Sequence, residues 1–122
     1  MIATVAFPGN AASVSGGPLA RLADVVPAVA ACWQPPLALR RFERAIVTAR
    51  FSLSRDGGLI GEPRVAFATD LPGEARALLT RSAITAIRDC TPVRLTSELG
   101  AAIAGRPFTV RFTYRGPRGR AL

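Results

Sequence analysis

The sequence contains no histidine and no lysine. Histidine is the commonest general base in enzymes, and lysine supplies the amine for Schiff-base chemistry, so both reaction types lose their usual residue. Two cysteines without histidine cannot close a tetrahedral zinc site. We also find no nucleophile–base pair, carboxylate dyad or phosphate-binding glycine loop. The sequence therefore predicts a binding or structural module and not an enzyme, with no cofactor and no bound metal.

Long apolar segments are also missing, because no run approaches the roughly 20 residues that a membrane-spanning helix needs. The chain has 122 residues, of which 49% are hydrophobic and 20% charged, a composition that fits one globular domain with one small core. Residues 1–17 carry no charge and no basic start typical of a signal peptide, and Pro8 interrupts their apolar stretch. We interpret them as a flexible arm or tether, and a domain that works outside the cytoplasm would need an export signal or anchor upstream of them.

Positive charge is present only as arginine. The 16 basic residues against 8 acidic ones give a formal net charge of +8. Such an excess favours an acidic partner, which could be nucleic acid, anionic lipid headgroups or an acidic protein face. The arginines are spread from Arg21 to Arg120, however, and a compositional bias would explain them equally well. Nucleic-acid binding stays an alternative, weakened by the scarcity of aromatic residues that could stack on bases.

The first half of the domain combines a helix with a hairpin. Apolar residues in 19–33 fall on one helical stripe that ends at Trp33, and Pro27 either kinks this helix or starts a shorter one. Residues 46–54 alternate between apolar and polar, which predicts a half-buried strand. The turn Arg55-Asp56-Gly57-Gly58 follows, with Asp56 and Gly57 serving turn chemistry only, and residues 59–67 return as a second strand. Pro63 inside that strand requires a position at the sheet edge.

The second half predicts a helix over 74–90, a short helical turn near 97–104 and a third strand over 108–114. Residues 115–122 are predicted to form a basic disordered tail. The domain of residues 18–114 is therefore α+β in the order α-β-β-α-β. We expect a three-stranded antiparallel sheet in the strand order 2-1-3, with both helices packed on one face.

The two cysteines stand at the ends of the two main predicted helices, Cys32 in the first and Cys90 in the second. Spacing alone leaves a disulfide and two buried free thiols equally open. Two helices on one face of a sheet would bring their ends together, which favours the disulfide between Cys32 and Cys90. Such bonds persist in oxidising compartments.

In this order the elements resemble the C-terminal domain of the TolA and TonB energy-transducing proteins. Four segments carry the resemblance: Ala31-Cys32-Trp33-Gln34-Pro35-Pro36, the hairpin of residues 47–59, Ala86-Ile87-Arg88-Asp89-Cys90-Thr91-Pro92, and residues 105–112. The paired cysteines are more like TolA than TonB. The Tyr-Pro start of TonB domains, the long linking segment and the membrane anchor are missing.

The resemblance implies a non-catalytic, periplasmic or secreted module for protein binding and protein transport in the cell envelope. Its partner would be a segment of an envelope or outer-membrane-associated protein, bound by strand addition (β-augmentation). The last strand is the free edge of the inferred sheet, because Pro63 blunts the other. Its predicted partner-binding residues are Phe108, Thr109, Val110, Arg111, Phe112, Thr113 and Tyr114. Arg111 and Thr113 would contact the partner's side chains and provide specificity. The alternative is an edge with no partner protein, either capped or paired with itself in a homodimer.

Overall fold

Three antiparallel strands form a single sheet in the order β2-β1-β3 in the computed structural model, which describes residues 17–116. Strand β1 (Arg44–Ser52) is central and pairs with β3 (Pro107–Arg115) along its whole length. Both strands bury every second residue, since the side chains of a strand alternate between faces. Phe51 faces Phe108 across this ladder, and their rings stack with centroids 5.5 Å apart. The predicted α+β fold and strand order are confirmed.

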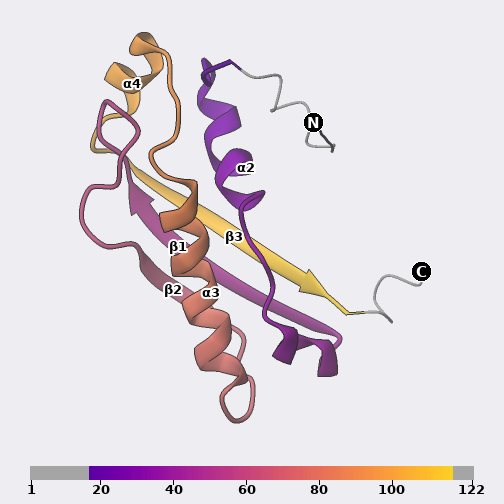
Figure 1. Ribbon diagram of the computed structural model, residues 1–122. Coiled ribbons are helices and arrows are strands. Elements are labelled where there is room, and N and C mark those ends of the chain that lie inside the picture. The colour runs from indigo at the N-terminus through magenta and orange to yellow at the C-terminus, as the bar shows by residue number, and fades with distance from the viewer. Residues whose placement is uncertain (1–16, 117–122) are drawn as a thin grey trace.

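The helices cover one face of this sheet (Figure 1). Helix α2 (Val25–Ala30) contacts β3, and α3 (Ala75–Cys90) contacts β1 and β2. The buried side of α3 consists of small and branched residues at helical spacing, Ala75, Leu79, Ala83, Ala86 and Ile87. A short α4 (Ser97–Ile103) begins at Thr96, whose side-chain oxygen accepts a hydrogen bond from the Leu99 N–H. The core thus lies between the helix layer and the sheet.

Two short 3-10 helices complete the N-terminal part, η2 (Leu22–Asp24) before α2 and η3 (Leu37–Arg41) before β1. Of the two alternatives for Pro27, the shorter helix is the correct one, since Pro27 lies in the first turn of α2, where a missing N–H costs nothing. Trp33 packs against the core, with its ring 5.4 Å from that of Phe112. Its indole N–H donates to the Ser82 hydroxyl of α3 at 2.9 Å. Trp33 therefore ties the chain after α2 to α3.

The second strand differs from the prediction. Residues 59–67 do not form one strand, because after the turn only Leu59 makes an isolated bridge, to Leu53. Gly61 then takes a positive φ of 71°, and β2 comprises Arg64–Ala68. Pro63 lies before this strand and not inside it, so it does not blunt the edge. Strand β2 is at the edge nonetheless, and a bulge opposite Thr48/Ala49 interrupts its register.

The remaining boundaries follow the predictions closely. Strand β1 starts two residues earlier than expected, and β3 continues to Arg115, one residue beyond the expected end of the domain. Helix α2 stops at Ala30, so Cys32 lies two residues past its end, while Cys90 is the last residue of α3. The predicted arm lies outside the described residues except for Gly17, and the predicted tail lies outside them from Pro117 onward.

Candidate functional site: the outer edge of the last strand

Strand β3 occupies one edge of the sheet, as its predicted role requires. The Gly116 N–H donates to the Glu43 carbonyl at 2.8 Å, in line with the β1–β3 register. Hydrogen-bonded and non-hydrogen-bonded pairs alternate along an antiparallel ladder, so the even-numbered residues of β3 bond to β1. The hydrogen bonds on the other side of β1 fit this alternation, because the N–H and C=O of the even-numbered Ile46 bond to Thr69 and not to β3.

The outer backbone row of β3 is therefore made by Thr109, Arg111, Thr113 and Arg115. Their N–H and C=O groups point away from β1, and within residues 17–116 no backbone bond pairs them with another segment. Pro107, which has no N–H to offer, lies at the start of this row. A row of unpaired donors and acceptors at a sheet edge is what an added strand requires.

The seven predicted binding residues divide between the two faces of the sheet. Phe108, Val110, Phe112 and Tyr114 are buried beneath the helices, and Thr109, Arg111 and Thr113 are exposed. The strand thus has one face in the core and one face in solvent. The buried four shape the core and would contact a partner strand only at its margin, whereas the exposed three stand beside any added strand.

An apolar groove, which the sequence reasoning missed, lies next to the start of this edge. It is lined by Leu22, Ala23, Val26, Arg106, Pro107 and Phe108. Leu22 is 51% exposed, although it continues the apolar stripe of the N-terminal helical segment. The stripe of 19–33 predicts core positions, but α2 begins only at Val25, and Leu22 lies in the preceding 3-10 helix η2, none of whose residues is buried. The groove gives the helix side of the edge an apolar wall.

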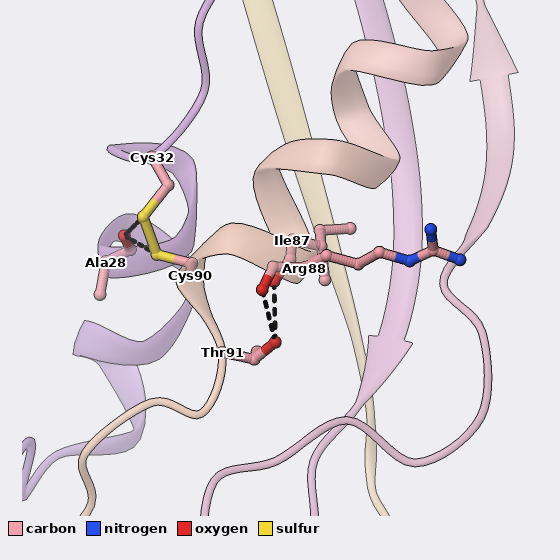
Figure 2. Close-up of a disulfide and its surroundings, with 6 residues drawn as sticks. All are labelled: Ala28, Cys32, Ile87, Arg88, Cys90 and Thr91. Carbon is pink, nitrogen blue, oxygen red and sulfur yellow. Dashed lines mark hydrogen bonds between the residues drawn. A yellow bond between two sulfur atoms is a disulfide. The ribbon is translucent and has the colours of Figure 1, made fainter.

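The disulfide fixes the helix layer behind this edge. Cys32 and Cys90 are bonded, with Cα atoms 5.9 Å apart, and Figure 2 shows them beside Ala28 of α2. The Ala28 carbonyl oxygen lies 3.3 Å from the Cys90 sulfur, a polar contact that involves no proton because both sulfurs are in the disulfide. The Thr91 hydroxyl is 3.1 Å from the carbonyls of Ile87 and Arg88 and satisfies the end of α3. The bond joins the segment just after α2, a helix that packs on β3, to the last residue of α3.

Other kinds of site find little support in the part of the chain that the structure describes. Residues 17–116 contain no group of three or more potential metal ligands. None of the helices described there is long and apolar enough to cross a membrane. The aromatic residues Phe51, Phe108 and Phe112, which could have stacked on bases, are buried in the core.

Comparison with known proteins places the fold. The solution structure of the TonB C-terminal domain of Helicobacter pylori matches with a TM-score of 0.51 and 15% sequence identity, over 76% of this chain and 90% of that domain. The chain therefore has a TonB-like fold. No curated protein matches it. A family model described as "Uncharacterised conserved protein UCP034077" matches residues 15–116. The chain belongs to this family of uncharacterised conserved proteins.

Proposed function

We propose that this domain is a non-catalytic protein-binding module that takes up an extended partner segment as a fourth strand beside β3. The observation that carries the proposal is the outward backbone row of Thr109, Arg111, Thr113 and Arg115, which has no partner within residues 17–116. Main-chain hydrogen bonds would supply affinity, and side chains on the two faces would supply specificity. The TonB-like fold supports a protein-interaction role.

We place the module in the periplasm or outside the cell, with an envelope or outer-membrane-associated protein as its partner. The Cys32–Cys90 disulfide supports this, because such bonds persist in oxidising compartments. Nucleic-acid binding has less support, since the buried aromatic residues leave few rings for stacking. A second copy of this chain, paired edge to edge, is the competing occupant.

The two sides of the edge predict the partner's pattern. One set of its alternating side chains would lie on the helix side, near the groove of Leu22, Val26 and Phe108. The other set would lie beside Arg111 and Arg115, which are exposed. We therefore expect a segment in which apolar and acidic residues alternate, because opposite charges on neighbouring strands stabilise pairing and like charges oppose it.

The test uses a synthetic peptide that alternates valine with aspartate and glutamate, and a control peptide of the same composition with the acids in one block. NMR titration of the oxidised full chain should shift the amides of Thr109, Arg111 and Thr113 with the alternating peptide and much less with the control. Arg111→Pro should abolish binding because it removes an outward N–H, whereas Arg111→Gln keeps that N–H and should only weaken binding. Shifts confined to another surface, or unchanged binding by Arg111→Pro, would refute strand addition at β3.

A further inference from the structure

The sheet face opposite the helices carries an unbalanced positive charge. Its outward positions include five arginines, Arg44 and Arg50 of β1, Arg64 of β2, and Arg111 and Arg115 of β3. All five are exposed. The other outward positions of the three described strands hold Ile46, Thr48, Ser52, Phe67, Pro107, Thr109 and Thr113, so no acid lies among them. We call this set of strand positions the arginine face.

Strand register places arginines directly opposite each other on this face. Arg50 pairs with Arg64 across β1 and β2, and Arg44 pairs with Arg115 across β1 and β3. Cβ atoms at such positions are about 5 Å apart, and like charges there destabilise a sheet. A compositional bias toward arginine would scatter the charges over the surface, whereas here two arginine pairs lie on the same face of the sheet. A ligand that neutralises them would relieve the repulsion.

The acids beside this face are too few to balance its five arginines. The two ion pairs found within residues 17–116 lie elsewhere, Arg21 with Asp24 and Arg88 with Glu62. Glu43 directly precedes β1. When Glu43 is counted with the three strands, they carry five positive charges and one negative charge.

We propose that the arginine face binds the surface of an anionic phospholipid bilayer. An extended peptide added beside β3 would be adjacent only to the row of Arg111 and Arg115, and would leave the arginines of β1 and β2 one and two strands away. The three strands span about 10 Å, and the six steps along β1 from Arg44 to Arg50 span about 20 Å. A planar array of phosphates reaches all five guanidinium groups at once, and guanidinium binds phosphate in bidentate geometry.

One apolar side chain on the face fits the same partner. Phe67, opposite Thr48 in the register, is 57% exposed among the arginines. At a bilayer surface an aromatic ring can enter the boundary between headgroups and acyl chains, as it does in interfacial binding segments. Single-stranded nucleic acid, in contrast, is usually held by two or three stacking rings on a sheet, and this face provides one. Binding would leave the outer edge of β3 open.

The experiment is vesicle co-sedimentation with the oxidised full chain. The probes are phosphatidylcholine vesicles with an equal part of phosphatidylglycerol, and pure phosphatidylcholine vesicles. We expect binding to the anionic vesicles only, weakening as salt is added. The double variant Arg50→Gln/Arg64→Gln should lose about 30-fold in partition coefficient, since each arginine near an anionic surface contributes about a factor of five. Phe67→Ser should also weaken binding.

The matched control is Arg76→Gln/Arg81→Gln, which removes two exposed arginines from α3 on the helix side and leaves the net charge the same as in the first double variant. It should bind like the unmodified chain. Equal loss in both double variants would show attraction by net charge alone and overturn the proposal. So would binding to single-stranded DNA without binding to anionic vesicles, or equal binding to both vesicle types. Because Arg50 and Arg64 do not lie on β3, the outcome is separate from that of the strand-addition test.

Discussion

The backbone of Gly57 packs directly against the backbone of Val93. The Val93 N–H donates to the Gly57 carbonyl at 2.9 Å, and a Cβ placed on Gly57 would lie 1.8 Å from the Val93 carbonyl oxygen. The turn after β1 is thus pressed against the segment between α3 and α4. Gly57 also has a positive φ of 88°, a backbone conformation that favours glycine.

Replacing Gly57 by alanine should therefore cost more than about 2 kcal/mol of unfolding free energy, because strain and collision add. Gly61→Ala is the matched control: φ is 71°, and nothing lies within 4 Å of the added Cβ. It should cost about 1 kcal/mol. Urea denaturation of both variants measures the difference, and equal losses would show that the contact with Val93 contributes nothing.

The disulfide should contribute to stability mainly by restricting the unfolded chain. Cys32 and Cys90 are 58 residues apart in sequence, and closing a loop of this length stabilises a fold by about 4 kcal/mol on the chain-entropy model. The double variant Cys32→Ser/Cys90→Ser should lose most of that amount in denaturation experiments. The unmodified chain should show the same loss in reductant, and the variant should not respond to it. A response of the variant would mean that the reductant acts elsewhere.

Much of this fold could be predicted because local pattern and tertiary role agree. Val47, Ala49 and Phe51 alternate with polar residues and do form one buried face. The second strand could not be predicted, because residues 59–67 look continuously extended while Gly61 with its positive φ breaks the path before Arg64. The interruption of the strand at Gly61 and Pro63 can be recognised only when the pairing of Leu59 with Leu53 is known.

The edge of β3 was accessible from sequence, but the arginine face was not. Alternation shows that Arg50 and Arg111 point away from the core, yet it does not give their neighbours across strands. The pair Arg50–Arg64 depends on the bulge opposite Thr48/Ala49, which shifts the register of β2 by one residue. Without that bulge Arg64 would not stand opposite Arg50. Only the structure therefore shows which charged residues lie opposite each other on neighbouring strands.

Relief of one like-charge pair should stabilise the isolated domain. Arg50→Glu replaces repulsion with attraction toward Arg64, and we expect a gain of about 0.5 kcal/mol at low salt. The gain should shrink as salt is added, because the pair is exposed to solvent. Arg76→Glu on α3 is the control of equal charge change and should leave thermal stability nearly unaltered. A lower melting temperature for Arg50→Glu than for this control would contradict the opposition of the two guanidinium groups.

Amide exchange should reveal the free edge directly. The N–H groups of Val110 and Phe112 bond to β1, whereas those of Arg111 and Thr113 point outward. Hydrogen exchange along β3 should therefore alternate, slow at even positions and fast at odd ones, at low protein concentration. Edge-to-edge dimerisation would slow the odd positions as concentration rises, while an added peptide strand would slow them at constant protein concentration. Protection of all four amides in a dilute, peptide-free sample would mean that the edge is already paired within the chain, and the strand-addition proposal would then fail.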